Sequence, residues 1–302
     1  MATSGRQEIS HERNPGPAVL ARIGLVTHPS RAIDGPLLEL REWAARCGVD
    51  LVQVYAFCRQ KQVAERGDAV DCDLIVSIGG DGTTLAAIHA GVEAGRPVLG
   101  VSCGSLGVLT TVAPDGVARA LDRFSAGDWV PRLLPALDGT RDGADPVFAL
   151  NDIALVRVGE GQVRVRAVID GTLFARVAGD GCVVSTQLGS SAYSLSAGGP
   201  LLAPGTHGFV FTPLYPHGGS CPPLVLTPDS ELELEITTGF GGVRLEVDGQ
   251  VVAGGVGQLR IRLCQGVATV VGFSDQEPFV AGLRRRGIIA DSPRFIAEDA
   301  RG

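Results

Sequence analysis

The sequence predicts an α/β N-terminal domain with a parallel sheet, followed by a β-rich C-terminal domain that is antiparallel and sandwich-like. Two observations support this division. Up to about residue 130, short apolar runs alternate with segments of helical spacing, which is typical of strand–helix–strand units in a parallel sheet. From Phe148 to Val271, short runs alternate apolar and polar residues and are separated by turn dipeptides, which indicates antiparallel strands.

The expected domain limits follow from these changes of pattern. Residues 1–17 are mostly polar, lack apolar periodicity and end in Pro-Gly-Pro, so we expect a disordered leader. The α/β domain is expected over residues 18–130 and the β-rich domain over residues 131–273. The tail, residues 274–302, is expected to return to the first domain as a helix, with its run Arg284-Arg285-Arg286 on a solvated face.

The elements of the first domain are predicted from apolar runs for strands and from helical spacing for helices, with Gly48 ending the first helix. The expected strands cover residues 18–27, 49–54, 73–78 and 96–101, and the expected helices cover residues 36–47, 83–94 and 117–125. In the second domain, alternating runs predict strands at residues 163–169, 231–236 and 243–247. The dipeptides Asp170-Gly171, Gly241-Gly242 and Asp248-Gly249 are expected to form hairpin turns.

The composition disfavours several classes of protein. The chain carries 26 Lys and Arg against 33 Asp and Glu, so it lacks the basic footprint that nucleic acid requires, and an anionic ligand would depend on local dipoles and a metal. No apolar run approaches the roughly 20 residues of a membrane span. The N-terminus also lacks a signal-peptide pattern, so we expect a cytoplasmic protein. The seven cysteines are scattered without metal-binding spacing and are expected to be reduced.

One strand-to-helix turn is expected to hold a phosphate. An apolar strand stops at Gly79-Gly80-Asp81-Gly82-Thr83, and helical spacing then resumes. Glycines allow backbone N–H groups to approach anionic oxygens closely, and the helix N-terminus adds its positive end. Asp81 would repel a phosphate, so its presence is explained if it acts as a base or as a partner of Mg²⁺. Taken alone, an ordinary turn with an N-capping aspartate explains the motif equally well.

Three more stretches are polar and rich in glycine: Asn151-Asp152, Gly179-Asp180-Gly181 and the segment from Gly189 to Pro200. Serine hydroxyls and backbone donors suit a polyhydroxylated ligand, and Tyr193 offers an aromatic face to a ring. A plain Ser/Gly hairpin loop would explain the last stretch by itself. Because four such stretches occur in one chain, we favour a ligand site.

The motifs occur in a fixed order along the chain. They are Gly79-Gly80-Asp81-Gly82-Thr83, Asn151-Asp152, Asp180-Gly181, Gly189-Ser190-Ser191-Ala192-Tyr193, Pro213-x-x-Pro216-His217, Pro223-Leu224-Val225-Leu226 and Asp248-Gly249-Gln250. With this set, the sequence from about Ile23 to Phe273 resembles the NAD kinase family. The first motif is shared with phosphofructokinase-like and lipid kinases, whereas the full ordered set is highly specific.

The resemblance implies an ATP-dependent kinase that transfers the γ-phosphate to the 2′-hydroxyl of the adenosine ribose of NAD, giving NADP. It implies an active site in the cleft between the two domains, completed by a neighbouring subunit in a homodimer or homotetramer. Asp81 would activate the hydroxyl or organise Mg²⁺ bridged by the phosphates of ATP. The donor phosphates would be bound by Gly79, Gly80, Gly82 and Thr83.

On the acceptor side, the resemblance implies that Asn151 and Asp152 hold the ribose and base and that Asp180 reaches across the cleft. The NAD site would be lined by Val108, Leu188, Ser191, Ala192, Tyr193 and Ser196. The chain departs from the family pattern at positions around base recognition, namely Ser102 for Asn, Val108 for an aromatic residue, Gln187 and Leu188 for Pro and Thr or Ser, and Pro222 for Arg. The phosphate turn is intact, so the kinase activity is better supported than the choice of NAD.

The departures keep alternatives open. A divergent enzyme of this kind could phosphorylate a hydroxyl of another nucleoside, a sugar or a polyol. A non-catalytic NAD(P) sensor is disfavoured by the intact Asp81, because a binding protein gains nothing from a carboxylate beside phosphates. A lipid kinase is disfavoured because the chain lacks a basic amphipathic segment for a membrane surface. The choice between ATP and polyphosphate as donor stays open.

Overall fold

The structure is a computed structural model that describes residues 16–104, 106–141 and 143–299. The expected leader lies outside the described residues except for Gly16 and Pro17, which belong to no helix or strand. The chain divides into two compact units. Among the described residues, the α/β unit comprises those up to residue 132 together with residues 269–299, and the β-rich unit comprises those from residue 133 to residue 268.

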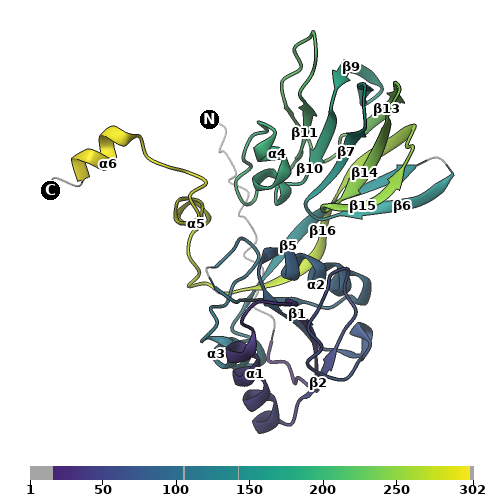
Figure 1. The fold of residues 1–302 in the computed structure, drawn as a ribbon. Coiled ribbons are helices and arrows are strands. Elements are labelled where there is room, and N and C mark those ends of the chain that lie inside the picture. The colour runs from purple at the N-terminus through teal and green to yellow at the C-terminus, as the bar shows by residue number, and fades with distance from the viewer. Residues whose placement is uncertain (1–15, 105, 142, 300–302) are drawn as a thin grey trace, which may run out of the picture. The chain divides into compact units, whose positions relative to one another are not determined.

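The α/β unit is built on four parallel strands in the order β2-β1-β3-β4, and the end of the long strand β16 adds to β4 in parallel at Val270 and Val98 (Figure 1). Its elements are β1 (Arg22–Thr27), α1 (Asp34–Cys47), β2 (Asp50–Gln53), the 3₁₀ turn η1 (Ala69–Asp71), β3 (Leu74–Gly79), α2 (Asp81–Ala94), β4 (Val98–Ser102) and α3 (Val117–Ser125). The predicted alternation of strand and helix is therefore confirmed. Because the strands are parallel, the loops that follow β1, β2 and β3 all leave from the carboxyl edge of the sheet.

Helices cover both faces of this sheet. Leu25 and Val76 belong to one apolar cluster with side chains of α1 and α3, such as Leu40. On the other face α2 lies close to the strands, because it is rich in Ala and Gly; a β-carbon on Gly91 would lie 2.6 Å from Val98 Cγ2. Helices α1 and α2 both end at a glycine in the left-handed region, as the sequence indicated for α1.

The β-rich unit is antiparallel, which confirms the predicted fold class. One sheet has the order β16-β13-β8-β9, and the other has the order β12-β11-β10-β7-β14-β15. The elements from residue 130 to the end of β16 are β5 (Val130–Arg141), β6 (Ala144–Ala149), β7 (Asp152–Val158), β8 (Val163–Ile169), β9 (Thr172–Gly179), β10 (Gly181–Ser185), η2 (Gly189–Ser191), α4 (Tyr193–Ser196), β11 (Phe209–Leu214), β12 (Leu224–Leu226), β13 (Leu232–Thr238), β14 (Gly242–Val247), β15 (Gln250–Gly254) and β16 (Gln258–Gly272).

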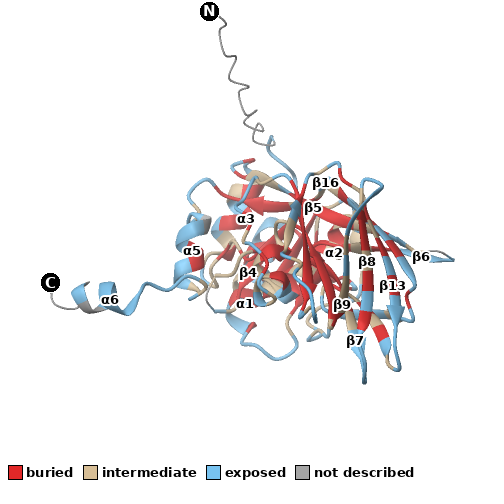
Figure 2. Cartoon of the chain, turned by 90° about the horizontal axis from the view of Figure 1, so that it is seen from above, coloured by how far each residue is buried: buried red, intermediate tan, exposed pale blue. Residues whose placement is uncertain are grey.

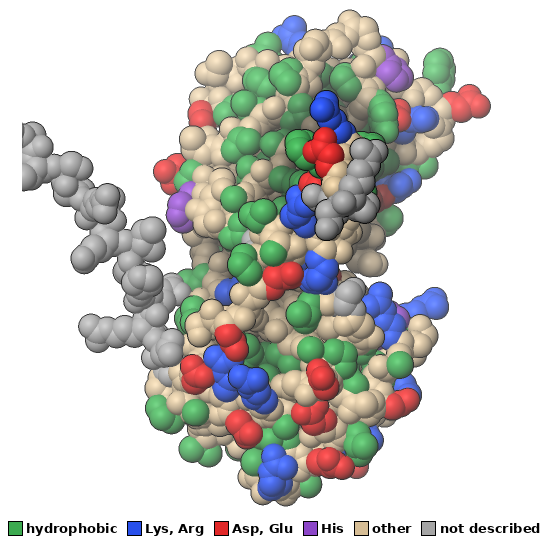
Figure 3. All heavy atoms as spheres, turned by 90° about the vertical axis from the view of Figure 1, so that its left-hand side faces the viewer, with side chains coloured by type: hydrophobic (Ala, Val, Ile, Leu, Met, Phe, Trp, Pro, Cys, Tyr) green, Lys and Arg blue, Asp and Glu red, His purple; other side chains and the backbone are tan. Residues whose placement is uncertain are grey.

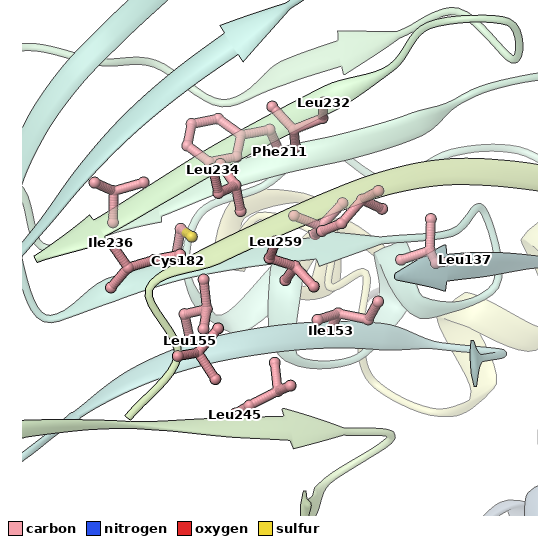
Figure 4. Close-up of a cluster of buried hydrophobic side chains, with 14 of the residues drawn as sticks. Leu137, Ile153, Leu155, Cys182, Phe211, Leu232, Leu234, Ile236, Leu245 and Leu259 are labelled. Atoms are coloured by element: carbon pink, nitrogen blue, oxygen red, sulfur yellow. The ribbon is translucent and has the colours of Figure 1, made fainter. Parts of the chain in front are cut away.

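The core of the β-rich unit lies between its two sheets. Leu232, Leu234 and Leu259 from one sheet meet Leu155 and Leu245 from the other in a single apolar cluster (Figure 4). Buried and exposed residues alternate along β13, as Figure 2 shows, because successive side chains of a strand point to opposite faces. This alternation is the pattern from which the strands were predicted.

Two of the three predicted hairpin turns are confirmed. At Asp170-Gly171 and Asp248-Gly249 both residues have positive φ, as a two-residue type I′ turn requires. The prediction for Gly241-Gly242 is wrong: β13 and β14 belong to different sheets, so the chain crosses between sheets there. Gly241 is needed because its backbone approaches another loop closely; a β-carbon would lie 2.3 Å from the carbonyl oxygen of Glu160.

The described part of the tail groups with the α/β unit. It carries α5 (Phe279–Arg285) and α6 (Pro293–Asp299). Arg123 of α3 pairs with Asp275 at 2.7 Å and lies 4.4 Å over the ring of Phe273, which attaches the start of the tail to the unit. No helix in the part of the chain that the structure describes is long and apolar enough to cross a membrane.

Candidate active site

The Gly-rich turn joins β3 to α2. Gly80 is the N-cap residue of α2, and the helix begins at Asp81, two residues earlier than the sequence predicted. Gly79 has no room for a side chain, because a β-carbon would lie 2.4 Å from Thr83 Oγ1. Thr84 is fully buried and its hydroxyl lies 2.8 Å from that of Ser77, which fixes the first turn of the helix on the strand. The N–H groups of this first turn form a site suited to an anion.

Asp81 does not cap its own helix, so the N-cap alternative is wrong. Its carboxylate accepts hydrogen bonds from the backbone N–H groups of Val108 (2.9 Å), Leu109 (2.9 Å) and Thr110 (3.3 Å). A β-carbon on Gly107 would lie only 2.0 Å from Asp81 Oδ1, so the loop passes directly over the carboxylate. Of the roughly four lone-pair positions of a carboxylate, these bonds use three and leave about one for a further partner.

Arginines hold the same loop through its carbonyl groups. Arg285 donates to the carbonyl oxygen of Leu106 at 2.9 Å, and Arg286 donates to that of Gly107 at 3.2 Å. Arg132 lies 3.5 Å from the carbonyl oxygen of Val108, and burial lowers the pKa of its guanidinium while the charge of Asp81 raises it. The expected solvated face holds for Arg284 and Arg285, which are exposed, but Arg286 is half-buried, and both Arg285 and Arg286 bind the loop that holds Asp81.

A basic pocket of about 300 Å³ opens beside the turn. Its lining combines Gly80, Asp81, Gly82 and Thr83 with residues that the sequence analysis missed, namely His28, Pro29, Arg31, Cys58 and Arg59. His28 Nδ1 accepts from the N–H groups of Ser30 and Arg31, which shapes the loop after β1. The guanidinium of Arg31 lies against Gly80, 2.9 Å from where a β-carbon would be.

The basic residues of the pocket were not predicted, because they form only a local excess of positive charge in a chain whose net charge is negative. On the lower body of Figure 3, which is the α/β unit, acidic and basic side chains lie side by side. Ion pairs such as Arg123 with Asp128 belong to this mixed surface, so net charge hides a local excess. Their position was a usable signal: Arg31 follows β1, which lies next to β3, and Arg59 follows β2, one strand further out, both at the carboxyl edge of the sheet.

In the β-rich unit a second carboxylate holds a predicted site segment. Asp248, in the turn between β14 and β15, accepts from the N–H groups of Leu150 (2.9 Å), Asn151 (2.6 Å) and Asp152 (3.1 Å). From the sequence, Asp248 was expected in a hairpin turn and as part of a motif, without any contact assigned to it. The structure shows that it fixes the backbone of Asn151 and Asp152.

Asp152 is 5% exposed, and burial raises its pKa to about 7, with further contributions from the charges of Asp248 and Glu246. Asn151 beside it is half-buried, and its carbonyl oxygen accepts from the N–H of Thr186 at 2.9 Å. A β-carbon on Gly189 would lie 1.9 Å from the same oxygen. The structure thus brings the Asn151-Asp152 segment into contact with the start of the predicted Ser/Gly segment.

The hydroxyls of the Ser/Gly segment have different roles. Ser190 and Ser194 are fully buried and bond within the fold. Ser191 is half-buried and donates to the carbonyl oxygen of Leu188, while Ser196 is exposed. Of the predicted lining residues, Leu188 and Ala192 are half-buried, and Tyr193 is 37% exposed.

A pocket of about 550 Å³ brings three predicted residues together, Asp180, Tyr193 and Ser196. It also contains two residues that the sequence analysis missed. Arg157 pairs with Asp180 at 2.6 Å, and Tyr215 is 71% exposed with a φ of 43°. Charged and aromatic groups in one pocket suit a ligand with a ring and polar substituents.

The ATP-NAD kinase N-terminal domain matches residues 25–129, and the ATP-NAD kinase C-terminal domain matches residues 150–271. A curated NAD kinase of Wolinella succinogenes is 31% identical over 269 residues, which are 83% of this chain and 90% of that protein. This chain belongs to the NAD kinase family. The NAD kinase of Heliobacterium modesticaldum is 35% identical over 208 residues, covering 67% of this chain and 74% of that protein.

Solved structures of the NAD kinase family share the fold. Yeast NADH kinase in complex with NADH aligns with a TM-score of 0.76 at 21% identity, over 91% of this chain and 89% of that one. An NAD kinase from Archaeoglobus fulgidus in complex with ATP aligns with a TM-score of 0.70 at 25% identity, over 89% of this chain and 100% of that one. The family that the ordered motifs predicted is confirmed.

Changing Gly107 to Ala should disrupt the contact between Asp81 and its loop, because the added methyl would collide with the carboxylate. Hydrogen exchange of the amides of residues 108–110 should accelerate about ten-fold or more, as expected when a buried hydrogen bond is lost. Gly104→Ala is a matched control in the same loop, since no atom lies within 4 Å of a β-carbon there. Equal exchange in both variants would contradict the role of Asp81 in holding the loop.

Asp152 should make stability depend on pH. Its pKa is raised from 3.8 to about 7, so the folded protein keeps a proton that the unfolded chain loses, and stability falls as pH rises from about 4 to about 7. In thermal unfolding, the stability of Asp152→Asn relative to the wild type should increase as the pH rises across this window, and the difference should stay constant above pH 7. The gain corresponds to about 1.4 kcal/mol per pKa unit. A constant difference across the window would refute the raised pKa.

Proposed function

We propose that this protein is an ATP-dependent NAD kinase that transfers the γ-phosphate of ATP to the 2′-hydroxyl of the adenosine ribose of NAD, giving NADP. The observation that carries the proposal is the intact Gly79–Thr83 turn, with Asp81 fixed beside a basic pocket, in a chain of this family. Phosphoryl transfer depends mainly on positioning and charge neutralisation, and this arrangement supplies both.

In this proposal the donor phosphates lie in the basic pocket. The first-turn N–H groups of α2 and the guanidinium groups of Arg31 and Arg59 neutralise them. Asp81 uses its remaining lone pair to accept the proton of the acceptor hydroxyl or to contact a metal ion. Its three backbone hydrogen bonds keep the carboxylate in one orientation.

Mg²⁺ fits this pocket only as a companion of the nucleotide. No group of three or more His, Cys, Asp or Glu side chains that could hold a metal ion occurs in the described part of the chain. Mg²⁺ is commonly bound by one or two carboxylates together with substrate phosphates. We therefore propose that the ion comes with the donor, with Asp81 as its protein ligand, and that it reduces the negative charge on the phosphates.

We propose that the β-rich unit binds the acceptor. Asn151, Asp152 and Tyr193, with Ser191, Ala192 and Ser196, supply polar groups and an aromatic face to the ribose and base. Asp180 is held by Arg157 in a pocket with Tyr193, which supports a role at the acceptor's edge. The cytoplasmic location stays a prediction.

We also propose a homodimer or homotetramer built through the β-rich unit. Val251 (64% exposed) and Val252 (47%) lie on the edge strand β15, and Leu173 on β9 is 43% exposed. Apolar side chains on edge strands favour burial against another chain.

A second candidate function is favoured by one observation. Leu188 and Val108 place apolar side chains where the family carries a hydroxyl and an aromatic group, and both are half-buried. A kinase with the same phosphate chemistry but another nucleoside, sugar or polyol as acceptor would be consistent with that change. A coupled assay of ADP release against NAD, NADH, nucleosides and inositols distinguishes the two candidates.

Asp81→Asn should lower turnover by about 100-fold or more, the range for a lost general base, while the unfolding temperature stays close to that of the wild type. Steady-state ADP release with saturating ATP and NAD is the measurement. Asp34→Asn is a suitable control, since the Asp34 side chain is 81% exposed. Turnover of Asp81→Asn near that of the wild type would refute the assignment.

Leu188→Thr combined with Val108→Phe should raise kcat/KM for NAD. A buried base nitrogen without a partner costs roughly 1–3 kcal/mol, or one to two decades in affinity, so the wild type should bind NAD weakly. A micromolar KM for NAD in the wild type, with no gain in the variant, would show a conventional acceptor pocket. Consumption of ATP with another hydroxylated acceptor but not with NAD would establish the second candidate.

A further inference from the structure

Two exposed aromatic rings stand next to the basic pocket and have no part in the packing of the core. Tyr55 is 74% exposed and Phe57 is 60% exposed, and their rings pack edge to face with centroids 5.5 Å apart. Between them Ala56 is buried and anchors the segment to the unit. An aromatic ring offers a flat apolar face on which a planar ligand ring can stack.

The aromatic pair belongs to the loop that supplies the basic pocket. Cys58 and Arg59, which follow Phe57 directly, line the pocket beside the Gly-rich turn. Tyr55 lines a second pocket of about 480 Å³. The two pockets therefore flank one short segment, residues 55–59, at the carboxyl edge of the parallel sheet.

Helix α2 also borders both pockets. Gly82 and Thr83 in its first turn line the basic pocket, while Ala90 and Glu93 line the second one. The eight helical steps from Gly82 to Ala90 span about 12 Å along the helix axis, at 1.5 Å per step. A ligand whose phosphates bind at the first turn could therefore extend along the helix toward the aromatic rings.

We infer that Tyr55 and Phe57 form the base subsite for the phosphate donor, which is a nucleoside triphosphate. The base lies on the exposed aromatic rings and the triphosphate extends to Arg59, Arg31 and the first turn of α2. The second pocket is also lined by polar side chains, including Arg66, Asp68 and Glu93, which can form hydrogen bonds with the edge of the base. The inference rests on the proposed function, because it locates the donor of that reaction.

The subsite separates two donors that the sequence left open. Inorganic tripolyphosphate carries as many phosphates as ATP and can use the basic pocket alone, but it offers nothing to an aromatic ring. Stacking of a base on an aromatic side chain changes affinity by about ten-fold or more. ATP should therefore bind more tightly than tripolyphosphate, and the difference should depend on the two rings.

Calorimetric binding of ATP and of tripolyphosphate to the full chain, without acceptor, tests the inference. Tyr55→Ala with Phe57→Ala should weaken ATP binding about ten-fold or more and leave tripolyphosphate binding unchanged. Phe240→Ala is the matched control, since Phe240 is a fully exposed phenylalanine of the β-rich unit. Equal binding of ATP by the double variant and the wild type, or a parallel loss for both ligands, would overturn the inference.

Steady-state kinetics gives a second measurement. The double variant should raise KM for ATP about ten-fold or more, with kcat and the KM of the acceptor close to wild type. The single variant Tyr55→Phe, with Phe57 intact, should keep most of the wild-type affinity for ATP, because a phenylalanine ring also stacks on a base. This outcome is distinct from failure of the proposed function. A protein that phosphorylates no NAD but loses ATP binding in the double variant refutes the proposed function and retains the subsite.

Discussion

The α/β part of the site depends on one set of hydrogen bonds, which the Asp81 carboxylate accepts from the backbone N–H groups of Val108, Leu109 and Thr110. A carboxylate beside a pocket that is proposed to hold phosphates is electrostatically unfavourable unless its charge is compensated. Here three peptide dipoles compensate it, and the positive charge of Arg132 adds to them. The same bonds fix the loop, so charge compensation and positioning come from one set of contacts.

The β-rich unit uses the same device with Asp248, which holds the backbone of residues 150–152. In both places a carboxylate binds consecutive N–H groups that no helix or sheet satisfies, and the held segment carries the predicted site residues. Such a segment keeps its shape without a covalent link or a large core. The two carboxylates also differ. Asp248 lies in a tight hairpin and adds to the burial that raises the pKa of Asp152, whereas Asp81 lies at the start of a long helix.

Charge in this protein is arranged locally. The net charge of −7 would discourage an anionic ligand, yet Arg31 and Arg59 gather beside the Gly-rich turn. Interactions between exposed charges fade over about 10 Å at ordinary ionic strength, so a phosphate in the pocket responds mainly to these neighbours.

The sequence by itself determined the features that depend on neighbours along the chain. The type I′ turn at Asp170-Gly171 follows from local backbone preferences, and so does the strand–turn–helix at Gly79–Thr83. The ordered motifs also predicted the family. Only the tertiary structure decided which loop Asp81 holds, and it corrected the hairpin predicted at Gly241-Gly242. The reason is that strand order and sheet membership are set by contacts between residues far apart in sequence, and those contacts leave no local pattern to read.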